Sequence, residues 1–176
     1  MRPILLGLCV LTAACSGQDS DSPTSPTSAI SAISRAQGKS DAQFPFVGSF
    51  TMRSGGVATP PTLQIAGTAE GTATALGRFT ATVTNVVELA TTESTGTLTF
   101  TAANGDQLIT TTTGSEDAFV PPNVSHVTLV ATIVGGTGRF AAAAGTFTVR
   151  WVGIIDFATN TSTETGSFEG HIALKQ

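Results

Sequence analysis

Two histidines and two cysteines are the residues of this chain best suited to hold a transition metal or to act as nucleophiles. His126 and His171 are too few for a zinc site, which would need further ligands from carboxylates such as Glu169. Cys9 and Cys15 both lie in the first fifteen residues, so the sequence after them offers neither a disulfide nor a thiolate site. We therefore expect no metal site.

The short motifs that mark catalytic or phosphate-binding loops are incomplete. Gly136-Thr137-Gly138 is not followed by the Lys-Ser or Lys-Thr pair of a phosphate-binding loop, and Ala141 stands where a dinucleotide-binding fingerprint has its third glycine. Neither histidine has a context typical of a Ser-His-Asp triad, and no nucleophile-elbow motif is present. We predict no catalytic residue and no cofactor, and we favour a protein that is not an enzyme.

Acidic residues near expected turns are a further set of candidates. Asp106, Glu116 and Asp117 could offer oxygen ligands to a cation, but their spacing does not reproduce a calcium loop. We expect these acids to cap turns.

Charged and aromatic residues inside apolar stretches are the remaining candidates for a site. A charge such as Glu70 or Glu88 that points into a β-barrel is costly unless it is paired, so it would indicate a pocket. Arg78 and Arg139, each just before a phenylalanine, could bind an anion, and Trp151 could stack on a ligand. The alternative, which we favour, is that the charges point into solvent, that the arginines cover apolar surface and that the tryptophan is part of the core. The residues concerned are Glu70, Glu88, Arg78, Arg139 and Trp151.

Composition and charge narrow the class of protein. The chain is rich in threonine, glycine, valine and phenylalanine, and β-branched and aromatic residues between glycine turns favour strands. The net charge is -4, without a basic cluster, so the positive field that attracts nucleic-acid phosphates is missing. An all-β fold is expected, and nucleic acid is excluded as a partner.

The N-terminus has the pattern of a bacterial lipoprotein signal peptide, residues 1–14. Arg2 precedes an apolar run from Ile4 to Leu11, and Thr12-Ala13-Ala14 supply small residues before Cys15. This region resembles the lipobox, in which the cysteine receives diacylglycerol before cleavage. We predict that Cys15 is lipidated and that the lipid anchors the chain to a membrane. Ser16, rather than Asp, resembles lipoproteins sorted to the outer membrane, so the expected location is the cell envelope, in its outer membrane if the host is Gram-negative.

Residues 15–43 are predicted to be a tether. After Cys15 the segment consists of Ser, Thr, Pro, Ala, Gln and Asp, including Ser22-Pro23-Thr24-Ser25-Pro26-Thr27. Too little apolar surface is available to offset the entropy of ordering such a chain. We expect a disordered spacer between the lipid and one folded domain, residues 44–176.

The domain is predicted to contain eight strands separated by glycine and polar turns. Asn104-Gly105 predicts a type I′ hairpin, and alternation in segments such as Thr97–Ala102 places apolar residues on one face. Eight antiparallel strands can close into an up-and-down, calycin-like barrel without exposed edges, and a two-sheet sandwich is the alternative. The expected strands are Phe44–Met52, Thr62–Ala73, Gly77–Leu89, Thr95–Ala102, Gln107–Thr113, Val124–Val134, Gly145–Phe157 and Thr165–Leu174.

One glycine-rich motif resembles a known family. Gly135-Gly136-Thr137-Gly138-Arg139-Phe140, followed by Ala144-Gly145-Thr146-Phe147 and preceded by the Asn104-Gly105-Asp106 turn, is similar to the allene oxide cyclase and dirigent-protein superfamily. The resemblance covers about Leu76 to Gly170. It implies an eight-stranded antiparallel barrel, often oligomeric, with a cofactor-free apolar cavity that guides a reactive small molecule. The catalytic and pocket residues of the plant proteins have no clear equivalents here.

Three functions remain open from the sequence. The first is a non-catalytic binding or interaction module that is displayed on a membrane and holds a small apolar ligand in the barrel. The second is a cofactor-independent cyclase or isomerase, which would need a roomy cavity with a positioned polar or acidic group. The third is a structural envelope protein with a filled barrel that associates with itself or with other surface components.

Overall fold

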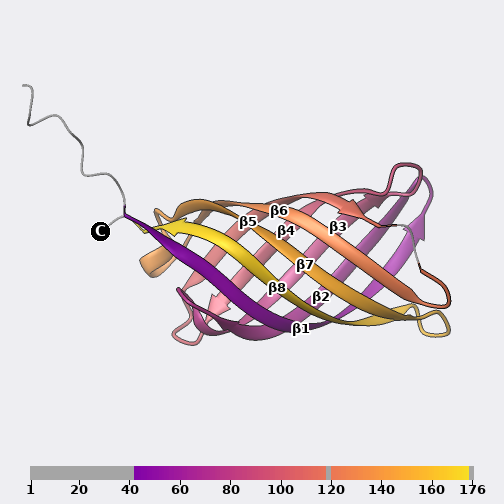
Figure 1. Cartoon of the computed structure of the whole chain (residues 1–176), viewed down its shortest axis with the longest axis horizontal. Helices are drawn as coiled ribbons and strands as arrows, with labels where there is room; N and C mark the ends of the chain where they lie inside the picture. Colours follow the sequence, from indigo (N-terminus) through magenta and orange to yellow (C-terminus); the bar gives the residue numbers. More distant parts are fainter. Residues whose placement is uncertain (1–41, 118–119, 175–176) are drawn as a thin grey trace, which may run out of the picture. The chain divides into compact units, whose positions relative to one another are not determined.

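The computed structural model describes residues 42–117 and 120–174, which form an all-β barrel. Each strand pairs antiparallel with the next, and β8 pairs with β1, so the sheet is closed (Figure 1). The predicted eight-stranded up-and-down barrel is confirmed, and the sandwich alternative is wrong. The elements are β1 (Gln43–Thr59), β2 (Thr62–Ala73), β3 (Gly77–Glu88), β4 (Glu93–Ala102), β5 (Gln107–Glu116), β6 (Val124–Gly136), the short 3-10 helix η1 (Gly138–Phe140), β7 (Ala144–Asp156) and β8 (Thr161–Ala173).

The predicted signal peptide (1–14), Cys15 and nearly all of the tether lie outside the described residues. Within residues 42–117 and 120–174, no helix has the length and apolar character needed to cross a membrane.

Five strands are longer than their sequence patterns predict: β4, β5 and β6 by two or three residues, and β1 and β8 by more at one end. β1 continues past Met52 to Thr59, and β8 begins at Thr161 rather than Thr165. Arg53-Ser54-Gly55-Gly56 has the composition of a turn, but these residues pair with β2 on one side, and Arg53 to Gly55 also pair with β8 on the other. Pairing with two neighbours supplies the backbone hydrogen bonds that override a weak local preference for strand.

The β4–β5 hairpin forms where predicted, but its turn is not type I′. A type I′ turn needs positive φ at both central residues. In this turn Gly105 has a φ of +88° and Asn104 is not among the residues with positive φ. The Gly105 amide donates to the Ala102 carbonyl at 2.9 Å, which is typical of a turn followed by a glycine bulge.

Along most of each strand, side chains alternate between the barrel interior and solvent. On β3, Phe79, Ala81 and Val83 are buried, whereas the threonines between them are exposed. Outward threonines also bond across strands, as in the 2.8 Å contact between the Thr84 and Thr97 hydroxyls. The fold is therefore held together by an apolar interior inside a threonine-rich wall.

Phenylalanine rings fill one half of the interior, which we call the aromatic half. Neighbouring ring centroids lie 4.9 to 6.3 Å apart, and each buried ring contributes roughly 1.5–3 kcal/mol of transfer free energy. Gly48 leaves the space that one ring occupies, because a Cβ there would lie 2.4 Å from Cζ of Phe168. The cluster consists of Phe46, Phe79, Phe100, Phe147 and Phe168.

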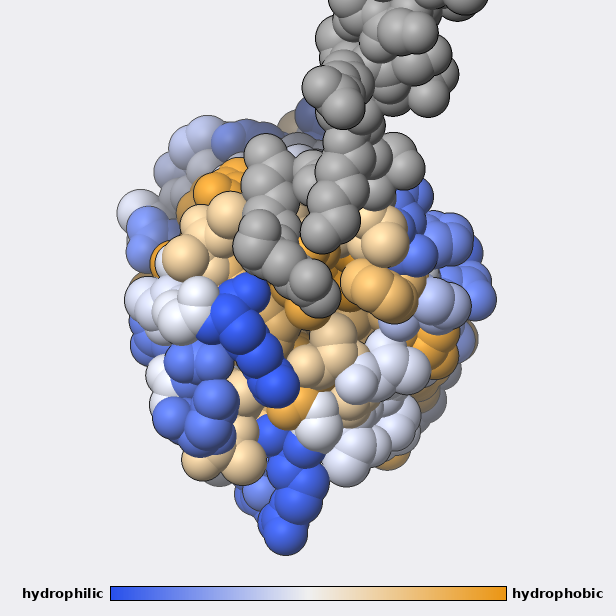
Figure 2. All heavy atoms as spheres, turned by 90° about the vertical axis from the view of Figure 1, so that its left-hand side faces the viewer, coloured by the Kyte–Doolittle hydropathy of each residue, from blue (hydrophilic) through white to orange (hydrophobic). Residues whose placement is uncertain are grey.

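The aromatic half also carries η1 and both ends of the described chain. β1 begins beside the end of β8, with Gln43 paired to Ala173, and the fully buried Phe140 of η1 packs into the same core (Figure 1). Figure 2 looks onto this end of the barrel and shows apolar residues in the middle of the end, with polar residues mostly around them.

The opposite half of the interior contains buried polar side chains. Glu164 and Ser54 are 3% and 9% exposed, and Asn85, Ser94 and Thr112 are buried with them. We call this part, defined by Ser54, Glu116, Ser162 and Glu164, the acidic half. The eight strands therefore place phenylalanine rings in one half of the barrel interior and polar side chains in the other half.

Candidate functional site

A cavity of about 210 Å³ lies in the acidic half, and we call it the acidic pocket. It extends to the barrel end formed by the β7–β8 connection, since Phe157 and Asn160 line it. Its walls come from seven of the eight strands. The lining residues are Met52, Ser54, Gly56, Leu63, Ile65, Val83, Glu116, Ser125, Val127, Trp151, Ile155, Phe157, Asn160, Thr161, Ser162 and Glu164.

Glu164 is the most deeply buried charged residue of this pocket. It shares the inward face of β8 with Gly166 and Phe168, two and four residues further on, and it pairs with Met52 on β1 and Gly153 on β7. Its Oε1 accepts a hydrogen bond from the Ser54 hydroxyl at 2.6 Å and a second from the Ser162 hydroxyl. Its Oε2 is buried without a hydrogen-bond partner among the described residues.

Glu116 supplies a second carboxylate from the end of β5. The Glu116 amide donates to the Thr92 carbonyl at 3.0 Å, which fixes the backbone at this point. Burial raises the pKa of the Glu116 carboxyl, and the nearby charge of Glu164 raises it further. The expectation that Glu116 caps a turn is wrong, because it ends a strand and its side chain lines the pocket.

Gly153 gives the pocket room beside Glu164. A Cβ at this position would lie 2.8 Å from Oγ of Ser125 and 3.2 Å from Cγ of Glu164. The remaining walls are mostly hydrocarbon and aromatic, including Leu63 and Trp151. The acidic pocket is thus an apolar cavity with carboxylate oxygens on part of its wall.

This arrangement can accept hydrogen bonds and can hold a proton or a cation. Among the described residues that line the pocket there are two carboxylates and no lysine, arginine or histidine. The serine hydroxyls that contact Glu164 have no imidazole beside them in that lining, so a serine-histidine pair is not formed there. In the part of the chain that the structure describes, no group of three or more His, Cys, Asp or Glu side chains could hold a metal ion.

Trp151 lines the acidic pocket and is, with Glu116, one of two candidates from the sequence that do so. It is 6% exposed and belongs to the hydrophobic core. Its ring packs edge-on against Phe50, with centroids 6.4 Å apart, and therefore stands between the pocket and the aromatic half.

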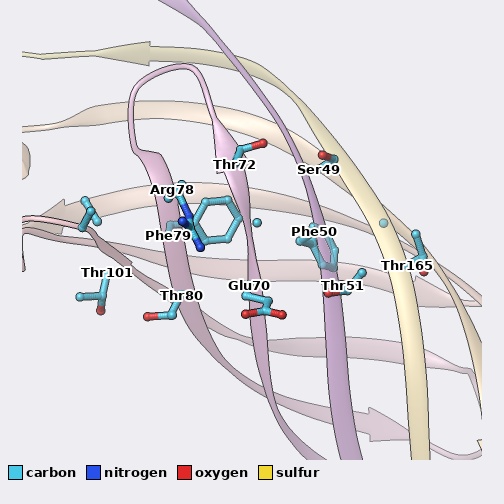
Figure 3. A pocket seen from close by; sticks show the side chains of 14 residues that line it. Ser49, Phe50, Thr51, Glu70, Thr72, Arg78, Phe79, Thr80, Thr101 and Thr165 are labelled. Carbon is cyan, nitrogen blue, oxygen red and sulfur yellow. The ribbon is translucent and has the colours of Figure 1, made fainter.

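Glu70 and Arg78 lie on the outside of the barrel. Both are exposed and contribute to an open groove of about 640 Å³ across β8 and β1 to β4, where Figure 3 shows them among outward threonines. Glu88 is also exposed, at the end of β3, where its backbone carbonyl accepts hydrogen bonds from the Thr91 and Thr92 amides at 3.3 and 2.8 Å. None of the three lines the acidic pocket.

Arg139 belongs to the glycine-rich motif at the aromatic end. Its guanidinium donates to the Leu76 carbonyl at 3.4 Å, lies 3.9 Å from the Asp106 carboxylate, and stacks over the Phe140 ring at 4.8 Å. Gly138, with a φ of +54°, leaves no space for a side chain, because a Cβ would lie 1.9 Å from Oδ1 of Asp106. Asp106 does cap this turn, since Oδ2 accepts from the Arg139 amide at 3.3 Å.

Sequence reasoning missed Glu164, Ser54 and Ser162, because all three lie in segments that have the composition of turns. The sequence of β8 does contain a signal for Glu164 and Ser162. Side chains on one face of a strand recur at every second residue, so counting back from the apolar Phe168 places Gly166, Glu164 and Ser162 on the same face.

Comparison with solved structures finds the pterocarpan synthase dirigent protein GePTS1, with 14% sequence identity and a TM-score of 0.45, over 79% of this chain and 90% of that chain. No protein-family model and no curated protein matches the sequence, so membership of the allene oxide cyclase and dirigent superfamily stays a prediction.

Proposed function

We propose that this protein is a lipid-anchored binding protein that holds one small, largely apolar molecule in the acidic pocket. The observation that carries the proposal is the cavity of about 210 Å³ lined by Glu164, a side chain with one carboxylate oxygen that is buried and has no partner among the described residues. A buried acceptor without a donor costs free energy, and a bound molecule that donates a hydrogen bond offsets that cost. A pocket with apolar walls and few convergent polar groups is typical of ligand sites.

The position of the pocket fits display from an N-terminal anchor on Cys15. β1 begins at the aromatic end of the barrel, and the β7–β8 connection is at the opposite end (Figure 1). The acidic pocket reaches that opposite end, since Phe157 and Asn160 of the connection line it. A barrel held through its N-terminus thus carries its pocket at the end that is remote from the point of attachment. We propose the cell envelope as the location, in the outer membrane of a Gram-negative host.

Native mass spectrometry tests the binding proposal. The protein is released from its host's envelope, and the mass of the folded form is compared with that of the denatured chain. We expect a reproducible small-molecule adduct that is lost on denaturation. A clean, unliganded mass from several growth conditions would overturn the binding proposal and favour a structural envelope protein.

Envelope fractionation tests the anchor separately. We expect Cys15→Ser to block processing of the precursor and to release the protein from the membrane fraction. Unchanged processing and membrane association would overturn lipidation at Cys15 without affecting the binding proposal.

A cofactor-independent cyclase or isomerase is the second candidate, and one observation favours it. Glu116 retains its proton to higher pH than an ordinary glutamate and lies near Glu164, as a general acid and base pair requires. The cavity of about 210 Å³ is, however, smaller than the roughly 300–1,000 Å³ of most small-molecule sites. Turnover of the molecule identified as an adduct, lost in Glu116→Gln, would establish this alternative.

A further inference from the structure

The charge of the acidic pocket is not balanced by a basic residue within it. Its described lining contains Glu116 and Glu164 and no basic side chain. The arginines and histidines on the lining strands are all exposed: Arg53, Arg78, His126, Arg150 and His171. Arg150 pairs with Glu169 on the outer surface at 3.1 Å. A ligand that enters the pocket therefore meets an unneutralised carboxylate.

The two oxygens of Glu164 differ in their hydrogen bonding. Oε1 already accepts from the Ser54 and Ser162 hydroxyls, whereas Oε2 is buried and has no partner among the described residues, in a side chain that is 3% exposed. A buried carboxylate oxygen is best satisfied by a charged donor, because such hydrogen bonds are stronger than neutral ones. No described side chain supplies such a donor to Oε2, so we expect the donor to belong to a bound molecule.

The rest of the lining favours a hydrocarbon body on that donor. Leu63, Ile65, Val83, Val127 and Trp151 surround the cavity with apolar atoms. A volume of about 210 Å³ limits the ligand to fewer atoms than a drug-sized molecule has.

We propose that the ligand of the acidic pocket is a small monoamine, bound as its ammonium ion, with an apolar ring or chain. The ammonium donates to Oε2 of Glu164, Glu116 contributes a second carboxyl group to the lining, and the hydrocarbon part contacts the apolar walls. This inference rests on the proposed binding function and names the class of molecule that the pocket selects.

Three molecules of similar size and shape test the proposal: cyclohexylamine, cyclohexanol and cyclohexanecarboxylate. Binding at neutral pH is measured by calorimetry and by the emission of Trp151, which is the only tryptophan and lines the pocket. The full chain carries Cys15→Ser, so that binding is measured without detergent. We expect the amine to bind at least about tenfold more tightly than the alcohol, and the carboxylate to bind most weakly.

Two matched variants locate the effect. Glu164→Gln keeps the shape of the side chain and an acceptor for the two serines, and we expect it to weaken amine binding about tenfold while alcohol binding changes by less than about threefold. Glu70→Gln makes the same chemical change in the outer groove, and amine binding should not change. If Glu164→Gln does not fold, the comparison of the three molecules on the unsubstituted pocket decides the question.

The outcomes separate this inference from the proposed function. Equal binding of amine and alcohol, or tightest binding of the carboxylate, would overturn the amine class while leaving a ligand-binding barrel. A loss of amine binding in Glu70→Gln and not in Glu164→Gln would place the ligand in the outer groove and overturn the inference. If none of the three molecules binds and the native mass shows no adduct, the proposed binding function itself fails.

Discussion

The two halves of the barrel interior are built from the same strands and differ in what those strands place inside. β8 contributes Phe168 and Ile172 to the aromatic half but Ser162 and Glu164 to the acidic half, and β1 likewise changes from Phe46 to Ser54. Rings packed at 4.9 to 6.3 Å stabilise one half, whereas the other retains a cavity and a carboxylate oxygen without a partner among the described residues. Stability and binding are therefore separated along the length of each strand rather than assigned to different strands.

The largest expected effect is the loss of a ring from the aromatic half. Phe168→Ala should lower the free energy of unfolding by about 3–5 kcal/mol, because it removes buried area and leaves a cavity among four other rings. Urea denaturation followed by Trp151 emission measures this. Phe44→Ala, at a ring that is 48% exposed, is the control and should cost less than about 1 kcal/mol. Equal losses in the two variants would contradict the contrast between the halves.

The second-largest expected effect is the loss of stability when a methyl group is added to the interior, and it should differ between the two halves. In the aromatic half, a Cβ at Gly48 would lie 2.4 Å from Cζ of Phe168 and 2.7 Å from the Thr72 carbonyl oxygen, so Gly48→Ala should cost about 1–3 kcal/mol. Gly56, on the wall of the acidic pocket, would meet only the end of Leu63 at 3.1 Å, and Gly56→Ala should stay within about 1 kcal/mol. Thermal denaturation of both variants checks the difference. A larger loss at Gly56 would show that the acidic half is the more tightly packed one.

A smaller effect is a pH dependence that originates in the acidic half. The pKa of Glu116 is raised in the folded state, so the native protein binds this proton more tightly than the unfolded chain does. Stability should therefore decrease as pH rises from the ordinary value of 4.5 through the raised pKa, and Glu116→Gln should remove that part of the slope.

Urea denaturation at a series of pH values measures the slope for both proteins. Glu164 is the titratable group that faces Glu116 in the pocket, whereas Glu93, Asp117 and His126 nearby are exposed. Glu70→Gln serves as the control, since its carboxylate is on the outer surface. An unchanged slope in Glu116→Gln would assign the pH dependence to another group.

The smallest effect is expected outside the barrel. Arg150 and Glu169 form an ion pair at 3.1 Å, with side chains that are 56% and 70% exposed. Solvent and salt screen such a pair, so Arg150→Ala should change the free energy of unfolding by about 0–1 kcal/mol. A double-mutant cycle with Glu169→Ala measures the coupling. A coupling above about 2 kcal/mol would show that the outer wall, too, contributes specific stability.

The fold could be predicted from the sequence because hydrophobic alternation is strong where the barrel is filled. Thr97 to Ala102 and the segment around Phe147 alternate clearly, and both belong to the aromatic half of the interior. The exceptions also have a physical cause. The end of β1 and the start of β8 are polar on both faces, so they lack the contrast from which a strand is recognised.

The candidate site could not be predicted by the same signal. Charged residues are usually exposed, so a buried carboxylate is not expected from its residue type. Glu164 also follows Thr161-Ser162-Thr163, which has the composition of a turn. Glu70 and Glu88 were candidates because they lie within clear strand patterns, but both side chains face solvent. Of the residues singled out from the sequence, Trp151 and Glu116 line the pocket, although Trp151 was expected in the core and Glu116 at a turn.

Pairing of the first strand with the last has a consequence for how the chain folds. Gln43 to Gly55 pair with Thr161 to Ala173, so the contacts that close the sheet join residues more than a hundred positions apart. Contacts between residues so far apart in the sequence form slowly, because the chain loses the entropy of closing a long loop before it gains the free energy of strand pairing. Until β8 has been synthesised, β1 and β7 are open sheet edges that can pair with other chains. The nascent protein thus depends on its final strand to become resistant to aggregation.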